Sequence, residues 1–367
     1  MITVLHEQRS TALADAQAEG DALWLTATDI EAATGWQWKP EGLCHGDVCM
    51  PVPPAQRAQW VREEAAGQPA RLNLAALWRH GGQPVVHDGS GRNWVLGTGA
   101  AQRAEALQSL QAPDFTLPDL QGQPHSLSQY RGRKLLLVTW ASWCGCRLDL
   151  ALWQSMMNEL QDTNFTVLAI ALDTAEAARP WIEAAAPSYP CLIDADHHVA
   201  ALYGIVNVPQ AVWIDEAGRI VRPTETAGSS DAFRSIDRST GALAPELAQA
   251  SQQRKAAYLA AVRDWARQGP ASAHALPAPQ AAARVPAPSA AQAEAHAWFL
   301  LGQQLLRQGQ ADAARSALDR ASQLHPDSWA IWRQHAPRDA RGLAVGEAFW
   351  ARVDALGDKP YYAPAQL

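Results

Sequence analysis

Two cysteines separated by a single glycine, Cys144 and Cys146, are the residues of this chain best suited to chemistry. They follow a continuous apolar run from Leu135 to Trp140, which is too short to span a membrane and is typical of a buried strand. Beyond them, apolar residues recur at helical spacing: Leu148, Leu150, Leu152, Trp153 and Met156. The pattern predicts a strand that leads to a cysteine pair at the start of a helix. The partial positive charge there favours a thiolate over a thiol, and Arg147 adds a nearby cation.

The short spacing limits how the two cysteines can pair. Residues two apart bring their Cα atoms within the disulfide range, roughly 5.5–6.8 Å here, only if the chain bends between them, and Gly145 permits that bend. Because the closed loop is tiny, the bond would gain little stability and should be easily reduced. Two interpretations stay open: a catalytic Cys144–Cys146 disulfide, or a Cys144 that is resolved by another cysteine.

Residues 113 to about 225 resemble the thioredoxin-like redoxins, especially thiol-disulfide oxidoreductases of the TlpA/ResA and AhpC–TSA type. Three segments carry the likeness in the family's order: APDFTLPDLQGQPHSLSQYRGRKLLLVTWASWC, FTVLAIALD and YGIVNVPQAVWIDEAGRIV. The resemblance implies an α/β thioredoxin-like domain in which Cys144 attacks and Pro209 is a cis-proline facing it. It also implies that Trp143, Val208 and Pro209 bind the substrate, with the backbone of Val208 open to an extended chain. Without the resemblance, Pro209 would be an ordinary proline that starts a strand.

The chain departs from the family at the cysteines. The usual pair is Cys-x-x-Cys, whereas Cys144-Gly145-Cys146 is one residue shorter, a form that a subset of redoxins shares. The Pro-x-x-x-Thr-x-x-Cys pattern of peroxiredoxins is absent, because Leu137 and Ala141 stand at the Pro and Thr positions. A dedicated peroxidase is therefore less favoured than a thiol-disulfide oxidoreductase.

The main hypothesis is a thiol-disulfide oxidoreductase that needs no cofactor. Cys144 would attack a disulfide-bearing or oxidised-thiol substrate, Cys146 would resolve the mixed disulfide, and an external thiol such as thioredoxin or glutathione would be the redox partner. A thiol-dependent peroxidase is the alternative enzyme. The alternative of another class is a protein without turnover that recruits partners or holds Cu(I) or Zn(II) through its thiolates. Cys191 is expected to be a small buried apolar residue.

Residues 1–105 are predicted to form a small α+β domain. Within it, a helix is expected over 72–80 and a hairpin from strands 84–87 and 93–96. Residues 36–54 are rich in Pro and Gly, predict a loop, and carry Cys44 and Cys49. Three interpretations of this pair remain open: a redox relay to Cys144, a structural pair, or metal binding through Cys44, His45 and Cys49.

The remaining chain is predicted to be helical. The redoxin domain is placed at 113–228, a helical extension at 229–268 and an extended Pro/Ala linker at 269–290. In the helical region 291–367, the offsets of one tetratricopeptide repeat appear at Trp298, Leu301, Gly302, Leu305, Ala314, Leu318, Ala321 and Pro326. A single repeat cannot bury its own face, so it must pack on the preceding long helix, the C-terminal helix or another subunit. The aromatic tail at 359–364 could dock on the body or fray.

Length, composition and charge limit the number of domains and the classes of binding partner. The 367 residues allow two or three domains, and the net charge of −7 argues against nucleic acid or an anionic membrane as the main partner. No run of 18 apolar residues occurs, and the first twenty residues lack a basic start followed by an apolar core. A cytoplasmic protein is expected, with a homodimer and a protein partner for the repeat as open possibilities.

Overall fold

The computed structural model describes residues 1–64 and 68–367. The chain forms two compact units, each built from two stretches of sequence. One unit contains residues 1–103 and 287–326, and the other contains residues 104–286 and 327–367. The predicted division into successive regions therefore differs from the structure, because the chain leaves the second unit after residue 286 and returns to it at 327.

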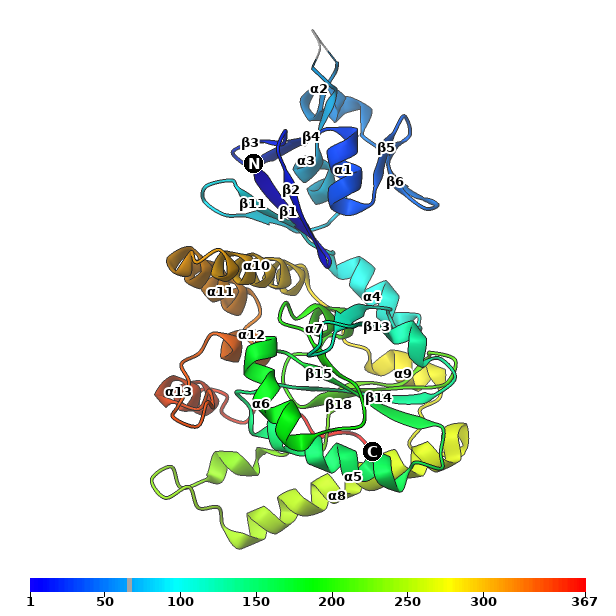
Figure 1. Ribbon diagram of the computed structural model, residues 1–367, viewed down its shortest axis with the longest axis vertical. Coiled ribbons are helices and arrows are strands. Elements are labelled where there is room, and N and C mark those ends of the chain that lie inside the picture. Colours follow the sequence, from blue (N-terminus) through cyan, green and yellow to red (C-terminus); the bar gives the residue numbers. More distant parts are fainter. Residues whose placement is uncertain (65–67) are drawn as a thin grey trace. The chain divides into compact units, whose positions relative to one another are not determined.

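A five-stranded mixed sheet is the centre of the second unit (Figure 1). Its order is β16 (Cys191–Ile193), β15 (Phe165–Ala171), β14 (Lys134–Trp140), β17 (Gln210–Ile214) and β18 (Ile220–Thr226). The first three strands are parallel, and β17 and β18 are antiparallel to their neighbours. Every residue of β14 and β15 is buried, as expected for strands covered on both faces. The predicted α/β class is confirmed.

The elements around this sheet follow the predicted order, with one difference at the cysteines. The hairpin β12 (Thr116–Pro118) and β13 (Pro124–Ser126) precede β14, while α6 (Ala175–Ala185) and α7 (His198–Tyr203) follow β15 and β16. The helix expected from Cys144 to about Leu160 is divided. A short 3₁₀ segment, Gly145–Asp149, comes first, and α5 (Leu150–Glu159) follows it.

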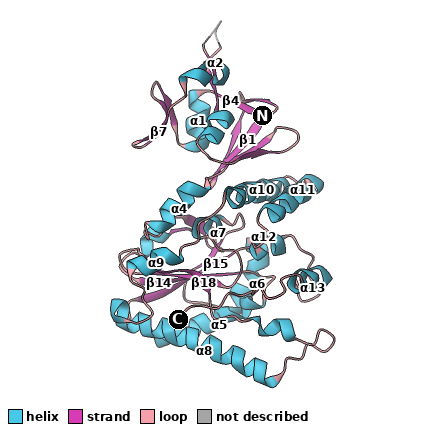
Figure 2. Ribbon diagram, turned by 180° about the vertical axis from the view of Figure 1, so that it is seen from behind, coloured by secondary structure: helices cyan, strands magenta, loops and turns pink. Residues whose placement is uncertain are grey.

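Helix α8 (Pro245–Gln268) covers one part of the sheet through aromatic packing. Trp265 stacks on Trp213 of β17 with 4.9 Å between ring centroids, and Trp213 donates a hydrogen bond of 2.9 Å to the Tyr258 hydroxyl. Ion pairs from Arg263 and Arg267 to Glu159 join α8 to α5, and the two helices run side by side (Figures 1 and 2). The helical extension is thus a part of the redoxin unit.

The Pro/Ala-rich segment expected as an extended linker is folded onto the same unit. It contains α9 (Ala278–Arg284), whose Ala281 is fully buried, and α9 packs on β18. The His274 carbonyl accepts a hydrogen bond from the buried guanidinium of Arg222. Small alanines allow close packing on the sheet, which composition alone does not distinguish from a solvated linker.

The last forty residues also belong to the second unit. Helices α12 (Trp329–Gln334) and α13 (Glu347–Asp354) form an aromatic cluster with the tail through Trp329, Phe349 and Tyr361. The Ala330 amide donates to the Val206 carbonyl at 2.9 Å. The region predicted as one helical body over 291–367 is therefore divided at residue 326.

Two small four-stranded sheets lie in the first unit. One has the order β10 (Val85–His87), β11 (Asn93–Leu96), β1 (Ile2–His6) and β2 (Arg9–Leu13), and the other has β3 (Gln17–Glu19), β4 (Ala22–Leu25), β9 (Arg71–Asn73) and β8 (Val61–Arg62). Helices α1 (Ala27–Thr34) and α3 (Leu74–His80) pack against them, and α2 (Arg57–Trp60) lies between the strands in sequence. Helix α4 (Ala100–Gln108) contains the boundary between the units. The α+β composition, the hairpin and the helix before Gly81 agree with the prediction.

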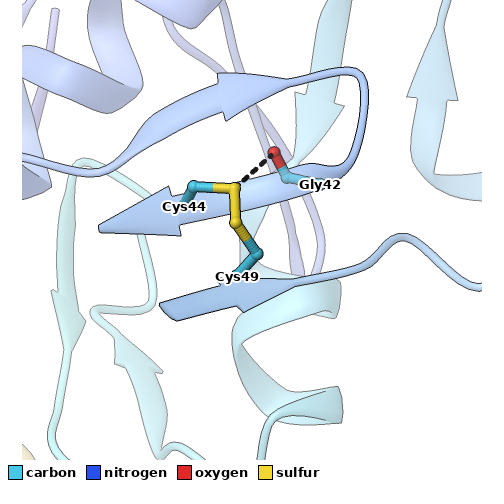
Figure 3. The surroundings of a disulfide bond; sticks show 3 residues. All are labelled: Gly42, Cys44 and Cys49. Carbon is cyan, nitrogen blue, oxygen red and sulfur yellow. Dashed lines mark hydrogen bonds between the residues drawn. A yellow bond between two sulfur atoms is a disulfide. The ribbon is translucent and has the colours of Figure 1, made fainter. Parts of the chain in front are cut away.

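The predicted loop around Cys44 and Cys49 is a small three-stranded sheet, formed by β5 (Gln37–Lys39), β6 (Gly42–His45) and β7 (Val48–Met50). Cys44 and Cys49 are opposite each other in the β6–β7 register and form a disulfide with 4.0 Å between their Cα atoms (Figure 3). Gly42 has φ +138°, and a side chain there would lie 2.2 Å from the Met50 carbonyl oxygen. The glycines of this segment, which suggested a loop in the sequence, thus allow its strands to approach closely.

The repeat helices α10 (Ala290–Arg307) and α11 (Ala311–Leu324) pack on the N-terminal sheet. This sheet is not one of the three packing partners that the sequence suggested. Ala297, Leu301 and Leu305 share one buried cluster with residues of β1, β10 and β11, namely Leu5, Val86 and Val95. Gln308 and Asn93 exchange hydrogen bonds of 2.9 and 3.1 Å. The apolar outer face of that sheet buries the face that a single repeat leaves open.

Gly302 allows α10 and α11 to approach closely. A Cβ at this position would lie 2.6 Å from Leu318 Cγ and 3.4 Å from the Ala314 carbonyl oxygen. We expect Gly302→Val to lower the free energy of unfolding by about 2–3 kcal/mol through overpacking. The denaturant midpoint measures this change. Arg315→Ala on the exposed face of α11 is the matched control, and an equal shift in both variants would contradict the close-packing explanation.

Candidate active site

Cys144 lies where β14 ends and the 3₁₀ segment begins. Its Sγ accepts a hydrogen bond from the Cys146 amide at 3.3 Å and lies 3.5 Å from the Val208 carbonyl oxygen. Cys144 and Cys146 are 3% and 8% exposed, and both are free thiols in this structure. The strand and the turn thus present two neighbouring sulfurs at one protected point.

The Val208–Pro209 peptide bond is cis, as the resemblance implied, and both residues are buried. Val208 has its polar backbone groups occupied within the chain. Its amide donates to Asn207 Oδ1 at 2.9 Å, and its carbonyl oxygen accepts from the Tyr362 hydroxyl at 3.1 Å. The cis-proline loop is therefore beside Cys144, as predicted, but the C-terminal tail lies on it.

The two thiols differ in acidity. Burial raises the pKa of Cys144, but the Cys146 thiol, the positive charge of Arg333, the Cys146 amide and the Tyr362 hydroxyl together lower that pKa to about 7. Burial raises the pKa of Cys146 well above its ordinary value, and the thiolate of Cys144 beside it adds to this rise. At neutral pH, Cys144 is thus the thiol that ionises and Cys146 keeps its proton.

Arg333 of α12 supplies the cation for this site. Its side chain is 3% exposed and donates to the Trp143 carbonyl at 3.0 Å and the Tyr361 hydroxyl at 2.8 Å. Its guanidinium carbon lies 4.6 Å from the centre of the Trp143 ring. Arg333 is 189 positions beyond Cys144 in the chain, and no pattern around it marks it as part of a site.

Arg147, the cation expected near the cysteines, is directed elsewhere. Its guanidinium donates to the carbonyls of Ser142 and Arg341 and lies 3.6 Å from the Trp181 ring centre. Trp143, expected to touch substrate, is fully buried and donates to Gln334 Oε1 at 2.6 Å. Residues from the last forty positions of the chain cover the side chains of Arg147 and Trp143. Neither side chain is therefore presented to a substrate in this structure.

A cavity of about 630 Å³ opens beside the cysteines. Its lining includes Cys144 and Cys146 together with Arg333, Phe349, Tyr361 and Tyr362. Asp149, which also lines it, is held by Lys255 of α8 at 2.5 Å. The volume is within the usual range for small-molecule sites.

Two segments of this chain match known protein families. Residues 109–222 match the AhpC/TSA family, and residues 295–336 match a tetratricopeptide repeat. The central domain is thus similar to the AhpC/TSA family. Its thioredoxin-like fold and the single repeat are therefore confirmed.

Curated relatives match about a third of this chain. One is the "Thioredoxin-like protein YneN" of Bacillus subtilis, 35% identical over 115 residues, which are 30% of this chain and 66% of the relative. Another is the "Thiol-disulfide oxidoreductase ResA" of Geobacillus thermodenitrificans, 29% identical over 111 residues, which are 30% of this chain and 64% of the relative. The chain thus spans just under two thirds of the length of these relatives.

Solved structures also align with part of this chain. A putative thiol:disulfide interchange protein DsbE from Chlorobium tepidum is 26% identical, with 41% of this chain and 95% of that chain covered and a TM-score of 0.30. A thiol-disulfide oxidoreductase from Bacteroides fragilis is 31% identical, with 30% and 87% covered and a TM-score of 0.29.

Three further cysteines lie away from the redoxin site. Cys191 is buried in β16, and burial raises its pKa to about 12, in keeping with the expected structural role. Cys44 and Cys49 are bonded to each other in the other unit. Among residues 1–64 and 68–367, no three His, Cys, Asp or Glu side chains are placed to hold a metal ion. Within the same residues, no helix is long and apolar enough to cross a membrane.

Proposed function

We propose that this protein is a thiol-disulfide oxidoreductase in which Cys144 attacks and Cys146 resolves. The Cys144 thiolate attacks one sulfur of a substrate disulfide, forms a mixed disulfide and releases the other sulfur as a thiolate, which takes a proton. Cys146, once deprotonated, attacks Cys144 Sγ and releases the second substrate thiol. Two electrons pass to the substrate, and the protein holds a Cys144–Cys146 disulfide that an external thiol returns to the reduced state.

One observation carries this proposal: two buried thiols in direct contact, of which Cys144 has a lowered pKa and Cys146 a raised one. Exchange needs one thiolate near neutral pH and a second thiol that stays protonated until it is needed. The names of the curated relatives support the same reaction class. The attack needs no separate base, because Arg333 and nearby hydrogen bonds stabilise the thiolate.

Thiol mapping by mass spectrometry across a series of redox buffers tests the proposal. We expect a Cys144–Cys146 disulfide that forms with a defined midpoint, and its formation should match, one to one, the loss of an added disulfide substrate. A pair that stays reduced in every buffer, or a Cys144 that is always bonded elsewhere, would sink the proposal.

The Cys44–Cys49 disulfide supports a further part of the proposal, a relay of electrons to or from Cys144. A Cys144 mixed disulfide with Cys44 or Cys49, isolated from the same mapping, would establish it. A disulfide on this hairpin suits an oxidising compartment at least as well as the predicted cytoplasm. An antioxidant role, thioredoxin or glutathione as donor, and a homodimer also remain predictions.

A further inference from the structure

The backbone beside the cis-proline is closed to an extended peptide. A bound strand needs a free amide and a free carbonyl on the surface that it joins. The single N–H of Val208 is used by Asn207 Oδ1, and its carbonyl oxygen faces the Tyr362 hydroxyl. The chain's own tail thus takes the place that an extended substrate would occupy.

The tail is held along its length and is not a loose end. The amides of Tyr361 and Tyr362 donate to the two carboxylate oxygens of Asp231 at 2.9 and 2.7 Å. The Tyr361 carbonyl accepts from Asn207 at 3.1 Å. Farther along, the Gln366 carbonyl accepts from Arg222 at 2.6 Å and Arg284 at 3.0 Å. Displacing this segment would break all of these hydrogen bonds at once.

A small molecule can still reach the sulfurs through the cavity of about 630 Å³. Most cations at its wall already have carboxylate partners: Lys255 pairs with Asp149, Arg341 with Asp339, and Arg238 with Asp354. The walls also contain the aromatic rings of Phe233, Phe349 and Trp350.

Arg333 is the exception among the charged groups of the wall. The groups that act most strongly on its charge are Tyr361, Tyr362 and the two cysteines, with no carboxylate among them. Among the residues that the structure describes, its Nε is buried without a hydrogen-bond partner. A guanidinium that lines a cavity without a carboxylate partner favours a ligand that brings an anionic group.

We propose that the substrate is a small anionic disulfide, which enters this cavity and places its acidic group toward Arg333, while the docked tail excludes extended polypeptides. This inference rests on the proposed function and specifies its substrate class. The exchange balances as above: the small disulfide gains two electrons and two protons and leaves as two thiols, and Cys144 and Cys146 become bonded.

The test uses the reduced full-length chain and follows formation of the Cys144–Cys146 disulfide in a single turnover. Three small disulfides of similar length differ in charge: 3,3′-dithiodipropionate (dianion), 2-hydroxyethyl disulfide (neutral) and cystamine (dication). Insulin supplies a protein disulfide. We expect the dianion to react roughly tenfold faster than the dication, a contrast that added salt reduces, and insulin to react more slowly than any of them.

Two variants separate the parts of the inference. Arg333→Gln should lower the ratio of the dianion rate to the neutral rate, a ratio that a change in the thiol alone leaves unaltered. Tyr362→Ala should raise the insulin rate relative to the neutral disulfide, whereas Tyr362→Phe, which removes the hydroxyl but keeps the ring, should raise it less.

Each result has a distinct meaning. Insulin reacting as fast as the dianion in the unaltered protein, or the dication reacting fastest, would overturn the substrate class while leaving the oxidoreductase intact. If no disulfide of either kind oxidised the pair, the proposed function itself would fall, and this inference with it.

Discussion

Cys144→Ser should abolish disulfide reduction, with a loss of about 10³-fold or more, because serine provides no thiolate to attack. Cys146→Ser should have a different effect. Its first step should proceed, and the protein should then accumulate as a stable mixed disulfide between Cys144 and one half of the substrate. Steady-state turnover by this variant should fall to the slow rate at which an external thiol releases the adduct.

The acidity of the two thiols explains the order of events. While Cys144 is ionised, burial and that neighbouring charge raise the pKa of Cys146 and keep its proton in place. The mixed disulfide removes the charge on Cys144, so one cause of the raised pKa disappears and Cys146 can ionise. The charge at the site thus delays the second thiolate until the first has reacted.

Intact-mass spectrometry after acid quenching distinguishes the variants. Cys146→Ser should carry one adduct per chain, Cys144→Ser none, and the unaltered protein an internal disulfide without adduct. Cys191→Ser, at a buried thiol with a raised pKa, is the matched control and should behave like the unaltered protein. An adduct on Cys144→Ser would assign the attack to Cys146 and reverse the proposed roles.

The local part of this site could be read from the sequence. A buried strand, a tight turn and two cysteines are neighbours in the chain, so apolar patterning is enough to place Cys144 and Cys146 at the end of β14. Pro209 could be added because the family resemblance extends to it. In both cases, the information lies within a short window or a known motif.

The distant part of the site could not be read in the same way. Arg333, Tyr361 and Tyr362 reach Cys144 only because α12 and the tail pack on the redoxin domain, and that packing depends on contacts such as the Ala330–Val206 hydrogen bond. Nothing in the local sequence separates a docked tail from a frayed one. The packing of the repeat helices could not be predicted for the same reason. Their apolar face indicates that it is buried, but the sequence does not show that the N-terminal sheet covers it.

Arg333→Gln should move the ionisation of Cys144 to higher pH. The charge of Arg333 is one of the causes that lower the pKa of Cys144 to about 7, so its removal should raise that pKa toward the ordinary thiol value. At pH 7, the ionised fraction of Cys144 would therefore fall several-fold. A more basic thiolate is intrinsically more reactive, which offsets part of this loss.

The two effects predict a crossing of the pH profiles. In the unaltered protein, the alkylation rate of Cys144 by iodoacetamide should rise with pH through about 7 and then level off. The variant should react several-fold more slowly at pH 7 and faster than the unaltered protein once the pH exceeds the pKa of both proteins. Thiolate absorbance at 240 nm gives the titration midpoint independently of the reaction.

Arg333→Lys is the matched control, because it keeps the positive charge but loses the planar donor geometry that reaches both Trp143 and Tyr361. Its midpoint should stay close to 7 even if the protein is less stable. A uniform slowing of Arg333→Gln at every pH would indicate a damaged fold without a change in acidity. An unchanged midpoint in a folded Arg333→Gln protein would leave the hydrogen bonds from Cys146 and Tyr362 as the source of the low pKa.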